Sequence, residues 1–253
     1  MRIDINADLG EGYGRYTCGD DDALLAIVTS ANVACGFHAG DPEIMAHTFE
    51  VAKQHGVAVG AHCGFPDLWG FGRRPIPFSA GEIERLVTYQ IGAAQALASY
   101  AGHRITHVNA HGTLANLAET DAAVADAVAR AIVAVDRNLA ALAIARSEQV
   151  RAAERAGLRV FSQIYADRAY TDQGTLVPRS QPGAVIHDAA EAATRVVAMV
   201  EAGALITVSG AKLKTPIDSV CVHGDSPDAI ATARTVRQKL EAAGATVAPF
   251  GSS

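Results

Sequence analysis

The sequence lacks several features that mark particular protein classes. It has 4 Cys in 253 residues, and none of them forms a Cys-x-x-Cys pair, so neither a disulfide framework nor a thiolate zinc site is indicated. Lys and Arg number 21 against 27 Asp and Glu, and the formal net charge of −6 argues against a nucleic-acid partner. No apolar run approaches the roughly 18 residues of a membrane span, and no basic-then-apolar leader follows Met1. We therefore expect a cytoplasmic protein with no membrane association.

Local signatures of several catalytic classes are missing as well. The chain contains no HExxH, no G-x-S-x-G and no G-x-x-x-x-G-K-[ST] motif, so zincin, α/β-hydrolase and P-loop chemistry lack their markers. What the chain does have is apolar material, with 49% hydrophobic and 19% charged residues. This balance suits one domain over residues 1–253, large enough for a single core.

Strand-like and helix-like segments alternate along the whole chain. The first strand-like segment, within residues 1–12, alternates Ile3, Ile5 and Ala7 with Asp4, Asn6 and Asp8. Further strands are expected at residues 30–36, 57–62, 105–111, 140–144, 159–167 and 219–225, with a hairpin around residues 205–213. This alternation favours a seven-stranded β/α barrel of the TIM class, and an open doubly wound sheet is the alternative.

Capping residues predict where several of the helices begin. Asp41-Pro42 predicts the start of a helix that Gly56 ends, and Ser79 with Glu82 forms a capping box for the next helix. We expect Thr120 to cap an alanine-rich helix, and Ser226-Pro227 to begin the last long helix.

Polar residues fall at or just beyond the C-terminal ends of six predicted strands, namely Asp8, His38, His62, His111, Asp167 and His223. In β/α barrels the C-terminal ends of the strands build the active site, so we expect these side chains to converge. Mixtures of imidazole and carboxylate suit proton transfer near neutral pH, polarisation of a carbonyl, or binding of a divalent metal. The residue types alone do not decide among these three.

Ordered motifs over almost the whole chain resemble those of the LamB/YcsF family. They are Asp8-Leu-Gly-Glu11, Ser30-Ala-Asn-Val-Ala-Cys-Gly-Phe-His-Ala-Gly-Asp-Pro42, Gly60-Ala-His62, Gly70-Phe-Gly-Arg-Arg74, His111-Gly112, Ala166-Asp-Arg-Ala-Tyr170, Val177-Pro-Arg-Ser180 and Cys221-Val-His-Gly-Asp225. The resemblance implies a seven-stranded barrel related to carbohydrate deacetylases. It also implies an ATP-dependent opening of the lactam 5-oxoproline (pyroglutamate) to glutamate, in complex with two other 5-oxoprolinase subunits.

Roles for individual residues follow from the resemblance. In the implied reaction ATP phosphorylates the amide oxygen and water then attacks the carbon. The residues expected to orient or deprotonate the water, to shuttle protons or to stabilise the oxyanion are Asp8, His38, His62, His223 and Asp225. Those expected to bind or position the substrate are Asn6, Glu11, Asn109, His111, Gln163, Asp167 and Arg168. The deacetylase relationship suggests a rival assignment, in which Asp8, His38 and His62 hold a divalent metal.

The chain departs from the family pattern at two positions. A lysine of the family is replaced by Asn109 within Val108-Asn-Ala-His-Gly-Thr-Leu-Ala-Asn116, a stretch that also lacks the family's tyrosine, and a glutamate of the family is replaced by Gln163. If the two charges form an ion pair across neighbouring strands, their joint loss is a compensated swap, because removing only one would leave a buried charge unpaired. If they contact substrate, the specificity has changed or the chain is a catalytically impaired paralogue.

Three functional hypotheses follow. The first is a subunit of an ATP-dependent enzyme that opens 5-oxoproline or a related small lactam. The second is a stand-alone metal-dependent deacetylase or amidohydrolase. The third is a non-catalytic binding or scaffold subunit, for which Asn109 and Gln163 are the only support.

Overall fold

Seven parallel strands close into a barrel in the computed structural model, which describes residues 1–226 and 228–251. The barrel strands, in the order in which they hydrogen-bond, are β1 (Arg2–Leu9), β2 (Ser30–Ala34), β3 (Ala58–Cys63), β4 (Ile105–Ala110), β5 (Ala140–Ile144), β6 (Val160–Tyr165) and β9 (Ser219–His223). The pairing of β9 with β1 closes the ring, with Asp8 opposite His223. The predicted β/α barrel is therefore confirmed, and the open sheet is excluded.

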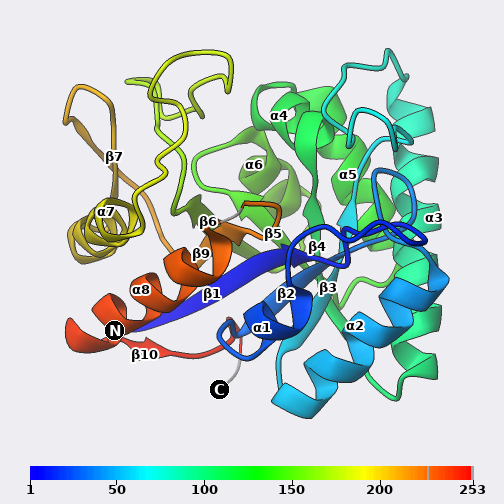
Figure 1. Cartoon of the computed structure of the whole chain (residues 1–253). Coiled ribbons are helices and arrows are strands. Elements are labelled where there is room, and N and C mark those ends of the chain that lie inside the picture. Colours follow the sequence, from blue (N-terminus) through cyan, green and yellow to red (C-terminus); the bar gives the residue numbers. More distant parts are fainter. Residues whose placement is uncertain (227, 252–253) are drawn as a thin grey trace.

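Helices surround the barrel (Figure 1). They are α1 (Asp21–Leu25), α2 (Pro42–His55), α3 (Ala80–Tyr100), α4 (Gly112–Thr120), α5 (Ala122–Val135), α6 (Glu148–Arg155), α7 (Ala189–Ala202) and α8 (Ala229–Ala242). Outside the barrel, β10 (Thr246–Val247) pairs with the start of β1, and β7 (Ala204–Ile206) forms a hairpin with β8 (Lys212–Lys214), as expected. Among the described residues no helix has the length and hydropathy needed to span a membrane.

Two of the four predicted capping signals agree with the helix starts of the structure. The Asp41 side chain accepts bonds from the backbone N–H groups of the first turn of α2, and Ser79 forms its capping box with Glu82 at the start of α3. The expectation at Thr120 is wrong, because Thr120 ends α4 and Asp121 caps α5 instead. Pro227 lies outside the described residues.

The barrel interior carries a layer of hydrogen-bonded polar side chains below the site. Asn6 Nδ2 donates to Gln163 Oε1 over 3.2 Å and to Ser219 Oγ over 2.7 Å. Asn32 Nδ2 donates to Asn6 Oδ1 over 2.7 Å and to Asp8 Oδ1 over 2.9 Å. Since buried polar groups are costly unless they are paired, this layer fixes the side chains of β1, β2, β6 and β9 relative to one another.

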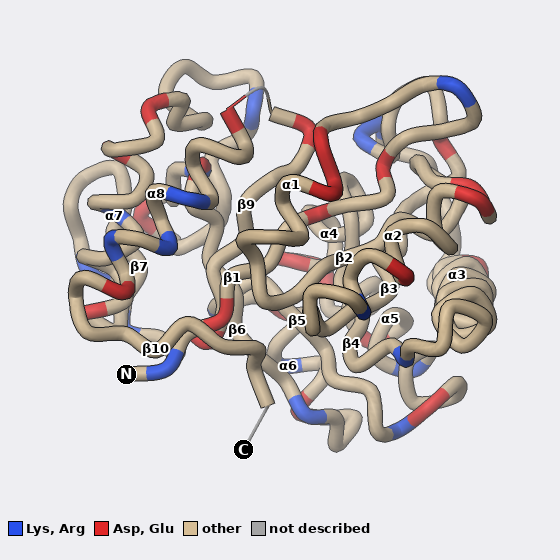
Figure 2. Tube along the Cα trace, turned by 60° about the horizontal axis from the view of Figure 1, so that its bottom comes forward, with Lys and Arg blue, Asp and Glu red and all other residues tan. Residues whose placement is uncertain are grey.

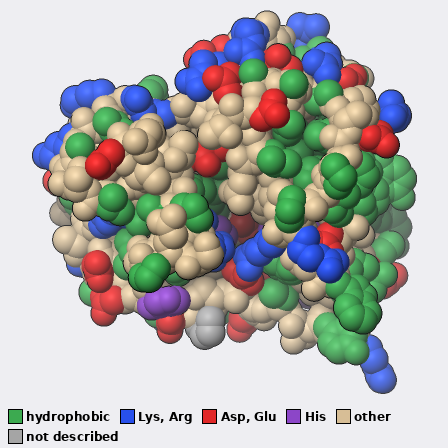
Figure 3. Space-filling model, turned by 90° about the horizontal axis from the view of Figure 1, so that it is seen from above, with side chains coloured by type: hydrophobic (Ala, Val, Ile, Leu, Met, Phe, Trp, Pro, Cys, Tyr) green, Lys and Arg blue, Asp and Glu red, His purple; other side chains and the backbone are tan. Residues whose placement is uncertain are grey.

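Two long loops lie above the C-terminal ends of the strands, one over residues 64–79 and one over residues 166–188 (Figure 1). Acidic and basic residues are interspersed over helices and loops along the whole trace (Figure 2). Seen from above, the face that carries the two loops is hollowed near its middle, with basic side chains at the rim of the hollow (Figure 3).

Candidate active site

Four buried side chains meet at the C-terminal end of the barrel. Glu11 follows β1, His38 follows β2, His62 lies in β3 and His111 follows β4. Glu11 Oε1 lies 3.1 Å from His38 Nε2, 3.9 Å from His62 Nε2 and 3.4 Å from His111 Nδ1, and His62 Nε2 lies 3.0 Å from His111 Nδ1. We refer to these four residues as the histidine cluster.

The histidine cluster has the chemistry of a metal-binding site. Metal–ligand bonds of about 2.0–2.2 Å in a tetrahedron place the ligand atoms roughly 3.3–3.6 Å apart, close to the separations observed here. His111 Nε2 lies 2.8 Å from the carbonyl oxygen of Phe71, which makes Nε2 the donor and leaves a lone pair on Nδ1. Burial, together with neighbouring imidazoles, lowers the pKa of His38 and His111, so both rings stay neutral. The donor set therefore fits a divalent cation such as Zn²⁺.

The members of this cluster differ from the sequence expectation. The expected metal triad is Asp8, His38 and His62, but Glu11 and His111 complete the group, and both were expected to bind substrate. Burial and the charge of Asp8 raise the pKa of Glu11 well above its usual range. A cation in the cluster would remove this cost by favouring the ionised carboxylate. Among the described atoms, His38 Nδ1 and His62 Nδ1 lack a hydrogen-bond partner.

Asp8 lies between the histidine cluster and a second imidazole–carboxylate pair, His223 and Asp167. Its Oδ1 atom lies 3.4 Å from His62 Nε2. Burial by itself would raise the pKa of Asp8, but the attraction of His62, with smaller contributions from His223 and His111, outweighs it and holds this pKa well below its usual range. Asp8 is therefore an ionised, buried carboxylate at neutral pH, able to accept a hydrogen bond from a water molecule.

His223 forms a second imidazole–carboxylate pair, with Asp167. His223 Nδ1 lies 2.8 Å from both carboxylate oxygens of Asp167, and its ring stacks on Tyr165 with the centroids 5.1 Å apart. Burial opposes a charge on this ring, but Asp167 outweighs it and raises the pKa of His223 above its ordinary value. An imidazole held in this way can donate a proton near neutral pH.

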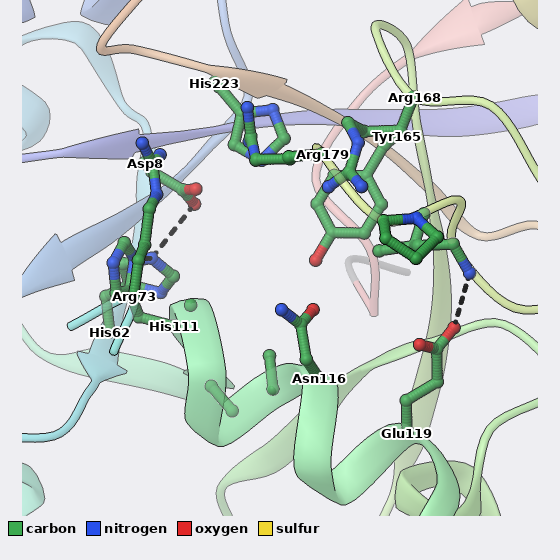
Figure 4. A pocket seen from close by; sticks show the side chains of 15 residues that line it. Asp8, His62, Arg73, His111, Asn116, Glu119, Tyr165, Arg168, Arg179 and His223 are labelled. Atoms are coloured by element: carbon green, nitrogen blue, oxygen red, sulfur yellow. Dashed lines mark hydrogen bonds and ion pairs between the residues drawn. The ribbon is translucent and has the colours of Figure 1, made fainter. Parts of the chain in front are cut away.

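A cavity of about 450 Å³ joins the two groups. Its polar lining consists of Asp8, His62, Arg73, His111, Asn116, Glu119, Tyr165, Arg168, Arg179 and His223. In Figure 4, Asp8, His62 and His111 lie on one side, Tyr165 and Arg168 on the other, and Asn116 reaches from α4 into the space between them. The size of the cavity, and the convergence of polar groups at the ends of barrel strands, are features of small-molecule sites.

The loop over residues 64–79 closes one side of the cavity and holds the histidine cluster in place. The Phe71 ring packs edge-on against His38 and His111, with centroid distances of 5.6 and 5.2 Å. Gly72 has φ +62°, and a Cβ atom there would come within 2.8 Å of His38 Cβ, so no larger residue fits. Arg73 extends to Asp225, with Nη2 2.7 Å from Oδ2. This ion pair ties the loop to the segment after β9.

Arg168 serves the second loop and is less free to bind substrate than we expected. Its Nη2 donates to the carbonyl of Val177 over 2.6 Å, and its Nε donates to the carbonyl of Ala184 over 3.3 Å. The guanidinium thus fastens the loop over residues 166–188 to the end of β6. Its role in substrate binding stays a prediction.

Asn6, Asn109 and Gln163 lie in the barrel interior, outside the set of residues that lines the cavity. Asn109 Nδ2 donates to the carbonyl of Leu142, and Gln163 Nε2 donates to Tyr165 Oη. The two positions do not lie on neighbouring strands, because β5 lies between β4 and β6, so an ion pair of the family's two charges would have to reach across β5. A contribution of these three residues to substrate binding remains a prediction, and it would have to act through Asp8 or Tyr165.

Five of the polar lining residues were not among the expected site residues, namely Arg73, Asn116, Glu119, Tyr165 and Arg179. Arg73 and Arg179 belong to the motif stretches Gly70-Phe-Gly-Arg-Arg74 and Val177-Pro-Arg-Ser180, so the family resemblance could have identified them as site residues. Tyr165 shares a strand face with Gln163. Asn116 and Glu119 lie on α4. Asn116 ends the stretch over residues 108–116 that was compared with the family pattern, whereas Glu119 lies outside the motif stretches.

Comparison with known proteins places the chain among its relatives. Residues 3–253 match the sequence model of the LamB/YcsF family. A protein of Azorhizobium caulinodans, named as the A subunit of 5-oxoprolinase, is 61% identical over 248 residues, which cover 98% of both chains. The solved lactam utilization protein of Thermus thermophilus superposes with a TM-score of 0.93 at 43% identity, and the match covers 99% of this chain and 100% of that one.

A more distant solved structure shares the fold alone. The catalytic domain of peptidoglycan N-acetylglucosamine deacetylase from Eubacterium rectale matches with a TM-score of 0.50 and 11% identity, over 98% of this chain and 88% of that one. The match over nearly the whole sequence, and the close relatives of equal length, lead to one conclusion: this chain is a member of the LamB/YcsF family.

Proposed function

We propose that this chain is the lactam-hydrolysing subunit of an ATP-dependent enzyme that opens 5-oxoproline to glutamate together with partner subunits. Relatives at 61% and 60% identity, both named as the A subunit of 5-oxoprolinase, support the substrate and the existence of partners. The observation that carries the proposal is the ionised Asp8 beside His62 on the wall of a cavity sized for a small molecule.

Hydrolysis of a lactam makes three demands on the site. A water must lose a proton as its oxygen bonds to the carbonyl carbon, the carbonyl oxygen must be stabilised as it gains charge, and the ring nitrogen must gain a proton as the C–N bond breaks. We assign the first task to Asp8, oriented by His62 and Asn32, and the proton donation to His223, held by Asp167. Asn116 is placed to hydrogen-bond the amide group of the substrate.

The reaction needs ATP because the carbonyl carbon of an unstrained lactam is a poor electrophile. Transfer of the γ-phosphoryl group to the amide oxygen, with ADP as the leaving group, would make the ring carbon open to attack by water. Cleavage of the C–N bond would then leave an acyl phosphate, which a second water would hydrolyse to glutamate and phosphate. The three arginines that line the cavity provide positive charge for such anionic groups. Partner subunits are proposed to supply or complete the nucleotide site.

A divalent cation in the histidine cluster would be held by Glu11, His38, His62 and His111. It would supply Lewis-acid polarisation of the substrate carbonyl or of bound water. The same atom of His62, Nε2, lies near both Asp8 and the cluster, so with a cation bound it would be a ligand and Asn32 would remain the donor to Asp8.

Co-expression with the partner subunits tests the proposal. The assembled complex is expected to release glutamate and phosphate from 5-oxoproline in an ATP-dependent manner, and the complex without this chain is expected to be inactive. If the complete complex leaves 5-oxoproline unchanged but opens another small lactam, the substrate is wrong and the reaction class stands. If it opens no lactam at all, the proposal fails.

The histidine cluster supports a second candidate, an ATP-independent metal-dependent amidohydrolase. Its signature would be a bound divalent ion in the isolated chain together with amide hydrolysis that needs neither ATP nor partners. Activity that depends on ATP would exclude it.

A further inference from the structure

Arg179 and His223 bring two nitrogen atoms together at the upper edge of the cavity. Arg179 Nη2 lies 3.3 Å from His223 Nε2. His223 Nδ1 is already engaged by the Asp167 carboxylate, so Nε2 is the nitrogen that faces Arg179. The His223 side chain is only 11% exposed, which fixes the direction of this nitrogen.

The arginines that line the cavity differ in what they already bind. The guanidinium of Arg73 is paired with Asp225, and that of Arg168 donates to two backbone carbonyls of its own loop. No carboxylate among the described residues lies within ion-pair distance of Arg179. Arg179 is therefore the lining arginine whose charge is available to a ligand.

The pairing of Arg179 with His223 calls for an acceptor when the imidazole is protonated. Asp167 favours that cationic form, and both ring nitrogens are then donors. Nη2 of Arg179 is a donor in every state. Two donors that face the same space are satisfied by one oxygen anion, and the aromatic face of Tyr165 that stacks on His223 holds the ring in place for it.

We propose that Arg179 and His223 form an anion subsite that receives the carboxylate of the lactam substrate, on the assumption that the proposed lactam function holds. Asp8 and His62 lie on another wall of the cavity, with Asn116 pointing into the space between (Figure 4). The ring nitrogen of such a lactam is bonded to the carbon that carries the carboxylate, so a carboxylate held at Arg179 keeps this nitrogen next to His223 Nε2, the proposed proton donor, with the amide carbon toward Asp8. The subsite thus selects lactams that carry a carboxylate next to the ring nitrogen and orients them for attack.

Calorimetric titration of the full-length chain tests the subsite without any turnover. The ligands are 5-oxoproline, 2-pyrrolidinone, which has the same ring without the carboxylate, and inorganic phosphate. The variants are Arg179→Gln, Arg179→Lys and, as a matched control, Arg234→Gln on the exposed face of α8. A charge-assisted hydrogen bond accounts for a change in affinity on the order of tenfold to hundredfold.

The expected result has three parts. Wild type binds 5-oxoproline at least about tenfold more tightly than 2-pyrrolidinone; Arg179→Gln removes that difference by weakening 5-oxoproline alone; and Arg179→Lys falls between the two. Arg234→Gln behaves as wild type. Equal binding of both lactams to wild type, absence of binding by either, or parallel loss of both in Arg179→Gln would overturn the proposal.

Binding of inorganic phosphate shows whether the subsite receives a carboxylate or a phosphoryl group. If binding of phosphate depends on Arg179 while that of 5-oxoproline does not, the subsite takes a phosphoryl group and the carboxylate assignment is wrong. The binding result is independent of the assay for lactam opening. If the complex is inactive but binding of 5-oxoproline depends on Arg179, the proposed function is wrong and the subsite stands. If the complex is active but binding of 5-oxoproline does not depend on Arg179, the subsite is wrong and the proposed function stands.

Discussion

The carboxylate of Asp167 holds His223 symmetrically, with Nδ1 2.8 Å from each of its two oxygens. This contact fixes the ring orientation and directs Nε2 toward Arg179 and the cavity. Hydrolytic enzymes use the same kind of carboxylate–imidazole pair, in which the carboxylate sets the tautomer of the imidazole and stabilises its cationic form.

Asp167→Asn should lower the pKa of His223, because Asp167 outweighs the effect of burial and burial alone favours the neutral ring. A pH titration of the His223 ring by NMR measures this shift directly. We also expect lactam opening by the complex to fall by roughly 10²–10⁴-fold, the usual contribution of acid–base catalysis. A variant with an unchanged His223 pKa would show that Asp167 does not control this ring.

The pKa of Glu119 predicts how stability depends on pH. Burial raises this pKa to about 7, against 4.5 for an ordinary glutamate. The folded state then retains a proton that the unfolded state loses, so stability should fall as pH rises from about 4.5 to about 7, by at most about 3 kcal/mol. Glu119→Gln should make the fall in thermal stability over this pH window shallower, with the remaining slope due to Asp4 and Asp21, whose pKa values burial raises to about 6. Glu201→Gln, at an exposed position on α7, should leave the slope of wild type. The same slope in Glu119→Gln would refute the assignment.

Removal of one ligand should abolish metal binding by the histidine cluster. Wild-type chain is expected to bind about one equivalent of Zn²⁺ and to gain thermal stability with it, whereas Glu11→Gln and His62→Ala should lose both effects. His47→Gln, at an exposed ion pair with Asp22, provides the control. Elemental analysis and thermal unfolding with and without Zn²⁺ give the answer, and wild-type protein without a bound ion at saturating Zn²⁺ would exclude this site.

Asn109 and Gln163 provide a test of the two departures from the family pattern. Both are buried, so Asn109→Lys or Gln163→Glu alone should destabilise the protein by several kcal/mol, roughly 3–5, through an unpaired charge. Both side chains point into the barrel interior, and we expect the double change to recover part of that loss across β5. A double-mutant cycle of thermal stability measures the coupling. Strictly additive losses would show that the two positions do not interact.

The sequence allowed the barrel and the position of the site to be predicted for a simple reason. Alternating apolar and polar residues, with caps at the helix starts, define the strands and helices locally, and parallel strands must bring their C-terminal ends together. His38, His62 and His111 were therefore expected to converge, and they do. Asp8 and His223 are direct partners across the β1–β9 pairing, as barrel closure requires.

The parts that could not be predicted depend on loop paths and on side-chain competition. Arg73 and Arg179 reach the cavity only because of how their loops fold back, and neither loop has a periodic pattern. Arg168 was expected to face substrate, but carbonyls of its own loop take up its donors. Glu119 lies outside the motif stretches, and its place at the cavity depends on how α4 packs against the barrel.

The central claim is that ionised Asp8 activates water for lactam opening, and the most direct test is turnover of 5-oxoproline by the assembled complex carrying Asp8→Asn. Asparagine retains an oxygen that can accept the hydrogen bond from Asn32 Nδ2, so the fold should persist and can be checked by thermal unfolding. We predict that release of glutamate falls by roughly 10²–10⁴-fold while binding of 5-oxoproline is retained. Glutamate release at the wild-type rate by a folded Asp8→Asn complex would contradict the account.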